Sequence, residues 1–219
     1  FTEEQLYSTA SYKAKDLRRT GWTADSTGWN LAGQDLRGAG LPRMLNGANL
    51  SGANISKTVI YSILTGADLS GANLTGTHVI DASLRDADLR DANLTDAYFR
   101  NVGMADADLT DADVRGGTFY EAGLSPTQLY STASYKARDL VAIHFVKCNL
   151  SAFNFAGQDL TGASFSRSTL TGADLSDAEV RGAGFSDTTT RGFTAAQLYA
   201  TASYKAKTLA GIGLAGNNL

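Results

Sequence analysis

Large apolar residues recur at every fifth position through most of this chain. One unbroken series runs from Leu69 to Leu124, and a second runs from Leu140 to Phe185. Two residues before nearly every large residue stands a small one, usually Ala. A period of five matches neither the 3.6-residue period of a helix nor the two-residue period of a strand. The pattern instead predicts very short extended segments that alternate with corners.

The large and the small residue of each step are predicted to point inward, while the polar residues between steps turn a corner. Four steps close a square coil of twenty residues, and stacked coils would pair as parallel β rungs about 4.8 Å apart. The repeated Ala-Asp/Asn-Leu motif, as in Ala67-Asp68-Leu69, resembles that of the pentapeptide-repeat family. The resemblance implies an all-β fold, a right-handed quadrilateral parallel β-helix.

Three places depart from this pattern. In the first third of the chain two intervals shrink to four residues, which predicts bulges or irregular corners there. Residues 18–30 contain Trp22 and Trp29 but do not follow the five-residue pattern of apolar residues. We therefore expect an irregular segment that covers the first coils. Phe153 stands where Ala is usual and predicts a distorted coil near residues 150–156.

A longer repeat occurs three times, as FTEEQLYSTASYKAKDL at 1–17, LSPTQLYSTASYKARDL at 124–140 and FTAAQLYATASYKAKTL at 193–209. Each copy opens with a Ser or Thr that is followed three residues later by Gln, a signal for the start of a helix. These signals predict short α-helices of about two turns at residues 3–11, 126–134 and 195–203.

The helices divide the chain into modules. We expect a helix-capped module at residues 1–123, a second helix-led module at 124–192 and a truncated third module, a C-terminal cap, at 193–219. The first and third helices are expected to cover the ends of the solenoid, because bare ends expose unpaired backbone. The second is expected to bulge from the solenoid or to divide it.

Composition narrows the classes of function. The formal charge of −3 gives no overall basic face, so no nucleic-acid partner is expected. No apolar run approaches the roughly 20 residues that span a bilayer. With two histidines and the single Cys148, no metal site and no cofactor are expected, and the thiol is predicted to be buried and inert. Because the coils would be full and no phosphate-binding or nucleophile motif occurs, the chain is predicted not to be an enzyme.

The segment from Asp81 to Glu121 is the sharpest candidate for an interaction face. Its ten acids against four arginines leave −6 over about two coils, on the order of 10 Å of axis. Duplex DNA carries one charge per ~1.7 Å, so the local density is comparable. The pentapeptide-repeat family includes gyrase-binding proteins that imitate DNA, and the resemblance therefore implies this role as an alternative. The residues chosen for the candidate face are Asp86, Asp88, Asp91, Asp106, Asp108 and Asp111.

Two other interpretations of these acids are open. Acids directly before a core residue commonly bond the turn backbone, and acids on adjacent coils pair weakly with arginines. Asp68, Asp88 and Asp108 would also stack on neighbouring coils, where calcium, which takes six to eight oxygens, could bridge them. The glycine-rich calcium-binding repeat, Gly-Gly-x-Gly-x-Asp, is absent from the sequence.

The favoured hypothesis is a non-enzymatic structural or protein-interaction solenoid that is part of a larger exported bacterial protein. The alternative is a DNA-mimicking topoisomerase inhibitor that acts through residues 81–121, and the third is a calcium-stabilised adhesin. The LYSTASYKAKDL-type module resembles repeats in exported proteins of planctomycete-type bacteria, which implies an extracellular or cell-envelope location; the topoisomerase hypothesis would place the chain in the cytoplasm. The first residue, Phe1, suggests a processed chain or an excised piece. The protein partner is not identified, and both a monomer and a homodimer through a solenoid end fit the sequence.

Overall fold

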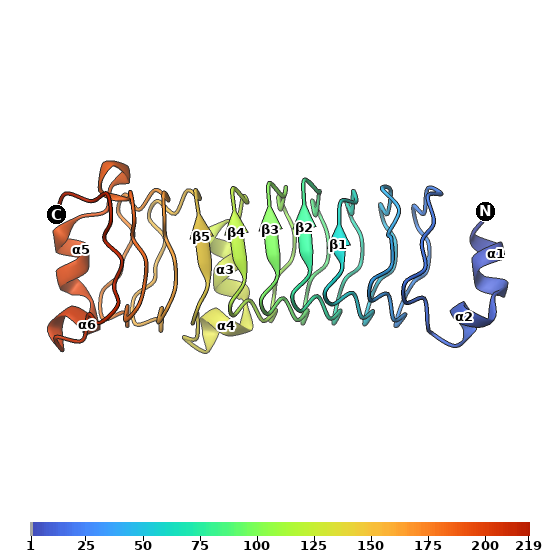
Figure 1. The fold of residues 1–219 in the computed structure, drawn as a ribbon, viewed down its shortest axis with the longest axis horizontal. Coiled ribbons are helices and arrows are strands. Elements are labelled where there is room, and N and C mark those ends of the chain that lie inside the picture. Colours follow the sequence, from blue (N-terminus) through green and yellow to red (C-terminus); the bar gives the residue numbers. More distant parts are fainter. Residues whose placement is uncertain (1) are drawn as a thin grey trace.

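The apolar residues of the five-residue beat lie inside the coils, as predicted. In one coil the four large residues Leu69, Leu74, Val79 and Leu84 are each at most 1% exposed. The computed structural model describes residues 2–219 as an all-β, right-handed parallel β-helix. Its coils stack along one axis from the N-terminal helices to the C-terminal helices (Figure 1). Side chains fill the interior along the whole stack.

One wall of the coils carries the regular strands. They are β1 (Val59–Ile60), β2 (His78–Ile80), β3 (Tyr98–Arg100), β4 (Thr118–Tyr120) and β5 (His144–Val146). These five strands form a parallel sheet in chain order. The other walls pair through single parallel bridges, such as Asp68 with Asp88. The strands have only two or three residues because a five-residue step leaves room for no more between corners.

The four-residue steps form short corners that stack on one another, and they are not the bulges that were expected as one possibility. Bridged residues in the first coils are nineteen apart, so each of these coils contains one short step. The step at residues 41–45 lies next to the step at 60–64, and neither contains a hydrogen-bonded turn. Later coils gain one residue at this corner, Asp81 or Asn101, with φ of 50° and 52°. Each four-residue interval in the sequence therefore corresponds to a regular coil that is one residue shorter.

The prediction of an irregular segment at residues 18–30 is wrong, because this segment forms the first coil. Gly21 pairs with Gly40 of the next coil. Trp22 and the fully buried Ser26 occupy the positions that apolar residues hold elsewhere. The indole nitrogen of Trp22 donates a hydrogen bond to the Ser26 hydroxyl at 2.8 Å. Trp22 gives the buried Ser26 hydroxyl a hydrogen-bond partner. Because a serine stands at a core position, the five-residue pattern of apolar residues is not visible in this part of the sequence.

Each predicted helix is in fact a pair of short helices. The pairs are α1 (Glu3–Ser8) with α2 (Ala10–Lys13), α3 (Pro126–Ser131) with α4 (Ala133–Lys136), and α5 (Ala195–Ala200) with α6 (Ala202–Lys205). A 3-10 turn, η1 (Thr189–Arg191), precedes the last pair. The capping boxes predicted at Thr2, Ser125 and Thr194 are all present.

A threonine interrupts each predicted helix. Thr132 is extended, with φ −67° and ψ 150°, and ends α3. Its hydroxyl donates to the carbonyl of Leu129 at 2.7 Å and accepts from the amide of Tyr135 at 3.2 Å. Thr9 and Thr201 do the same in the other copies. The continuous helices predicted at 3–11, 126–134 and 195–203 are therefore corrected to two helices that share one cap.

The helix pairs replace single rungs of one wall. The successive levels of this wall are α1–α2, Asn30, Asn49, Asp68, Asp88, Asp108, α3–α4, Asn154, Asp174 and α5–α6. The coils continue past α3–α4, because β4 pairs directly with β5 through Thr118 and His144. In Figure 1 this pair lies against the stack without separating its coils. Residues 2–219 thus form one uninterrupted solenoid.

The predicted distortion near Phe153 is also wrong. The following residue, Asn154, bridges to Asp174 as in an ordinary coil. Phe153 is buried, and its ring meets that of Tyr130 in α3 edge to face, with 6.3 Å between centroids. The preceding level of this wall is the helix pair α3–α4 in place of an ordinary rung, and it leaves room for the Phe153 ring. Among residues 2–219 no helix has the length and apolar composition needed to cross a membrane.

Candidate functional site

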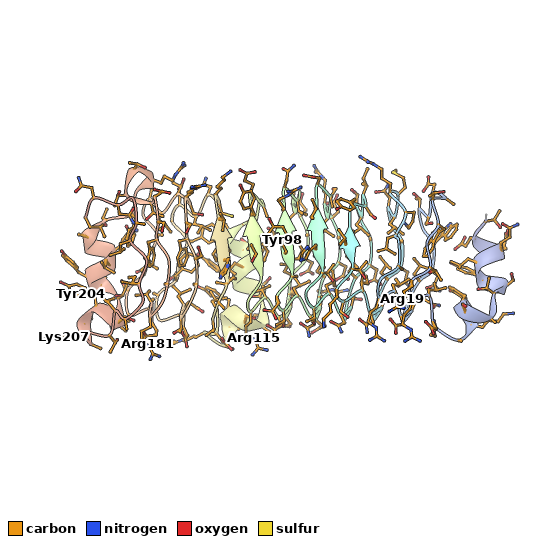
Figure 2. All side chains as sticks on the ribbon, in the orientation of Figure 1. Arg19, Tyr98, Arg115, Arg181, Tyr204 and Lys207 are labelled. Atoms are coloured by element: carbon orange, nitrogen blue, oxygen red, sulfur yellow. The ribbon has the colours of Figure 1, made fainter. Side chains whose placement is uncertain are left out.

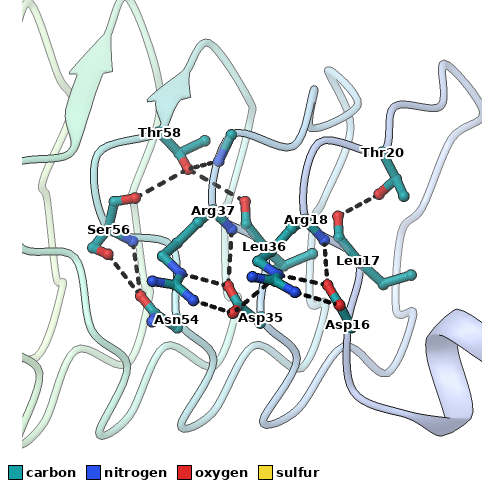
Figure 3. Close-up of polar contacts among 11 residues, drawn as sticks. Asp16, Leu17, Arg18, Thr20, Asp35, Leu36, Arg37, Asn54, Ser56 and Thr58 are labelled. Atoms are coloured by element: carbon teal, nitrogen blue, oxygen red, sulfur yellow. Dashed lines mark hydrogen bonds and ion pairs between the residues drawn. The ribbon is translucent and has the colours of Figure 1, made fainter.

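Asp88 and Asp108 of the candidate face stand on the wall directly before a core residue. They bridge to one another on adjacent coils. The Asp88 carboxylate accepts the amide of Arg90 at 3.0 Å, and that of Asp108 accepts the amide of Thr110 at 2.9 Å. Asp35 makes the same contact, to the amide of Arg37 (Figure 3). The turn-bonding role predicted for these acids is confirmed.

The other four acids of the face stand at corners. Asp86, Asp91, Asp106 and Asp111 have φ between 56° and 60°. Glycine fills the same corner in neighbouring steps, for example Gly71 with φ 62°. Asp tolerates the left-handed region better than most residues with a Cβ atom. Part of the acidic density therefore reflects the backbone geometry of the corners.

Arginines of the same coils pair with these acids. Arg85 lies 3.4 Å from Asp86 and 3.8 Å from Asp106. Arg90 lies 2.5 Å from Asp88 and 3.8 Å from Asp108 on the next coil. Hydrogen bonds from the Arg90 side chain lower the pKa of the Asp88 carboxyl below its usual value. The wall acids are thus held in ion pairs along the stack.

Two lysines outside the segment approach it from later in the chain. Lys136 of α4 contacts Asp111 at 2.7 Å, and Lys147 contacts Glu121 at 2.9 Å. Asp139 also approaches, at 3.4 Å from Arg115, so these three residues change the charge of the surface from −6 to −5. Sequence reasoning missed both lysine pairs because the inserted helices change the register, so that Lys136 and Lys147 lie 25 and 26 residues from their acids and not 20. Exposed pairs of this kind contribute only about 0–1 kcal/mol each, so the pairing mainly lowers the charge that a partner meets.

The face remains accessible despite this pairing. The side chains of Asp86, Asp106 and Asp111 are 54%, 72% and 52% exposed. A groove of about 470 Å³ separates Asp106 and Asp108 from α3. Its wall carries carboxylates and hydroxyls and no nucleophile with an activating base. The acids Asp86, Asp106 and Asp111 therefore stand at an accessible surface.

Metal ligation is not supported by the geometry of the Asp68, Asp88 and Asp108 ladder. Both carboxylate oxygens of Asp88 accept hydrogen bonds from Arg90. Over the part of the chain that the structure describes, no three His, Cys, Asp or Glu side chains gather closely enough to hold a metal ion. Cys148 is buried, and burial raises the pKa of its thiol to about 11. The thiol is therefore a core group, as predicted, and not a reactive one.

Comparison with known proteins gives a family and several solved structures. The model for pentapeptide repeats matches residues 62–101, 80–116 and 148–187, with 8 copies. HetL, a pentapeptide repeat protein involved in heterocyst differentiation regulation in the cyanobacterium Nostoc, is 28% identical, covers 82% of this chain and 83% of its own, and gives a TM-score of 0.33. QnrB1, a plasmid-mediated fluoroquinolone resistance protein, is 17% identical. The match covers 91% of this chain and 82% of QnrB1, with a TM-score of 0.29. No curated protein sequence matches this chain significantly.

Proposed function

The chain belongs to the pentapeptide-repeat family, and we propose that it serves as a non-enzymatic structural or protein-interaction solenoid within a larger exported bacterial protein. The observation that carries the proposal is the sealed, continuous stack. The pairing of β4 with β5 carries the coils past the inserted helices. Large side chains such as Phe119 and Phe145 are fully buried along the axis. Such an interior leaves the walls and the ends as the surfaces for function.

A spacer must keep its length, and the stacking of the coils supports this role. The ten levels of the helix-bearing wall span about 45 Å at the spacing of paired strands. Each level is hydrogen bonded to the next, and the aromatic rings of neighbouring coils stack inside. No linker divides the stack, so we expect the chain to behave as one rod.

Small-angle X-ray scattering tests this role. A single rod of constant cross-section, with no flexible joint at α3–α4, is the expected result. Residues 124–140 are the place to look for a joint, because the second copy of the long repeat lies there. Scattering from two bodies that move independently would contradict the spacer role. Capture of a partner through the acidic face would instead favour the interaction role.

The exported location rests on the triple LYSTASYKAKDL-type repeat, which resembles modules of exported bacterial proteins. Its test is protease treatment of intact cells of the bacterium that encodes the chain. We expect an antibody against the chain to detect its loss while a cytoplasmic marker survives. Equal survival of both would contradict the proposed location.

DNA mimicry at a topoisomerase is the second candidate, favoured by the exposure of Asp86, Asp106 and Asp111. The test is a gyrase supercoiling assay, titrated with the chain and with a variant carrying Asp86→Asn, Asp91→Asn, Asp106→Asn and Asp111→Asn. Inhibition by the parent that the variant lacks would establish charge mimicry. Because lysines and arginines neutralise much of the face, we expect no inhibition at micromolar concentration.

A further inference from the structure

The second and third helix pairs each have an inner side that docks on the preceding coil. The Gln128 amide group donates to the carbonyls of Met104 and Ala107, at 2.6 and 2.9 Å. The Ser134 hydroxyl accepts the amide of Val114 at 2.9 Å. The equivalent groups, Gln197 and Ser203, dock α5–α6 on its preceding coil in the same manner. The inner contact is thus a repeated, specific interface.

The outer side of the first two pairs receives the next coil through two tyrosines. The amide of Asn154 donates to the Tyr130 hydroxyl at 2.5 Å, and the Tyr135 hydroxyl donates to the carbonyl of Asn154 at 2.9 Å. The Gln158 side chain donates to the carbonyl of Tyr135 at 3.2 Å.

The first module repeats this contact atom for atom. Its tyrosines, Tyr7 and Tyr12, bind the amide and the carbonyl of Asn30 at 2.5 and 2.7 Å. Gln34 donates to the carbonyl of Tyr12 at 3.1 Å. The receiving segments share the sequence Asn-Leu/Phe-Ala-Gly-Gln-Asp. Two hydroxyls therefore replace the strand that would otherwise pair with this edge.

The third pair carries the equivalent tyrosines, Tyr199 and Tyr204, but no coil of the described residues packs on their outer side. Tyr199 and Tyr204 are 51% and 40% exposed, and no described residue hydrogen bonds to either hydroxyl. With Lys205, Lys207 and Leu209 they line a groove of about 490 Å³. Figure 2 shows Tyr204 and Lys207 at the end of the stack.

The open pair already has the geometry of the occupied pairs. The ring centroids of Tyr199 and Tyr204 lie 4.5 Å apart, against 4.4 Å for Tyr7 with Tyr12 and 4.6 Å for Tyr130 with Tyr135. The two rings therefore already have the separation found in the occupied pairs, which lowers the entropic cost of docking.

We propose that the outer side of α5–α6 is a docking site for the edge of one further pentapeptide coil that carries an Asn-Leu/Phe-Ala-Gly-Gln rung. Tyr199 accepts the backbone amide of the asparagine, Tyr204 donates to its carbonyl, and the glutamine donates to the carbonyl of Tyr204. An unpaired coil edge requires such partners, because its amide and carbonyl face outward along the axis. This inference deepens the proposed interaction role and rests on it.

The test supplies the coil by extending the chain. Gly213 continues the ladder of His144, Ser164 and Gly184, so Leu219 holds the place of Leu150. The ten residues SAFNFAGQDL, copied from residues 151–160, are therefore added after Leu219. Tetranitromethane nitration, mapped by mass spectrometry, should attack Tyr199 and Tyr204 in the parent faster than Tyr130 and Tyr135. In the extended chain this difference should disappear.

Two controls make the result specific. The matched control adds the same ten residues in scrambled order and should leave both tyrosines reactive. The extension should also raise Tm by about 5 °C, and Tyr199→Phe with Tyr204→Phe should remove most of that rise. Unchanged nitration in a folded extended chain, or equal protection by the scrambled tail, would overturn the proposal. Protection in the parent together with a doubled mass in light scattering would assign the face to a second copy and would also overturn it. Neither result would affect the scattering test of the rod.

Discussion

At the scale of the residue, each position in the five-residue step has its own physical requirement. The position before the core residue needs an acceptor for the amide two residues on, and Asp, Asn or Ser supplies it. The corner position needs a positive φ, so Gly or Asp fills it most often. Acidic residues collect at both positions for structural reasons, and their number alone is weak support for binding.

Asp113 offers a test of the structural role of these acids. Hydrogen bonds from the Arg115 side chain, then its amide and the Ser134 hydroxyl, lower the pKa of Asp113 to about 2. Since the folded pKa lies below the unfolded one, the stabilisation is present above about pH 4 and is lost as the pH falls toward 2. Asp113→Asn should reduce the free energy of unfolding by about 1.5 kcal/mol at pH 7. Urea unfolding should show this gap closing between pH 4 and 2. Asp91→Asn, whose parent carboxylate makes no ion pair with a described residue, is the control and should change stability little.

Leu89 tests the register of the core. Its side chain is fully buried, so Leu89→Ala should lower the free energy of unfolding by about 3 kcal/mol through lost contacts and a cavity. Leu89→Asp should unfold or aggregate the chain, because the charge would be sealed inside a coil. Thermal unfolding checks both variants. Val59→Ala, on an exposed strand position, is the control, and an equal loss there would contradict the register.

At the scale of the element, a threonine decides the shape of each helix insertion. The sequence favours one helix, since Ala, Leu, Lys and Gln are good helix formers. Thr132 instead takes an extended conformation and caps both α3 and α4 with one hydroxyl. The resulting bend lets Tyr130 and Tyr135 reach the same residue of the next coil. The only local signal for this break is a second N-cap residue, Thr132, within a sequence that otherwise favours a helix.

Thr132→Val keeps the shape of the side chain and removes both cap hydrogen bonds. We expect a loss of about 1–2 kcal/mol in the free energy of unfolding, the usual cost of losing a cap. Urea denaturation followed by circular dichroism measures it. Thr9→Val removes the same bonds at the end of the stack, where the helices touch a coil on one side only, and it should cost less. An equal or larger loss from Thr9→Val would contradict this account.

At the scale of the whole molecule, the solenoid is continuous because its inner rings stack across the insertion. Phe119 and Phe145 are separated by the second helix pair in sequence, yet their centroids lie 5.6 Å apart. A double-mutant cycle with Phe119→Ala and Phe145→Ala should give a coupling of about 1 kcal/mol. The distant pair Phe99→Ala and Phe185→Ala should be additive. Zero coupling for the first pair would indicate two separate solenoids.

The sequence by itself determined the coil, its core and its capping boxes. A period of five with a large and a small residue in each step places both side chains inward, so residues such as Leu69 and Leu89 were assigned to the core correctly without coordinates. The turn role of Asp88 and the burial of Cys148 followed from the same register.

Only the tertiary structure decided the features that depend on neighbours far apart in the chain. Ser26 occupies a core position because Trp22 supplies a hydrogen bond, and Phe153 fits because α3 leaves it room. Lys136 reaches Asp111 only because the helix pair takes one rung of the wall. Local pattern fixes which side of the backbone a residue faces, whereas the stacking of distant segments fixes what it meets there.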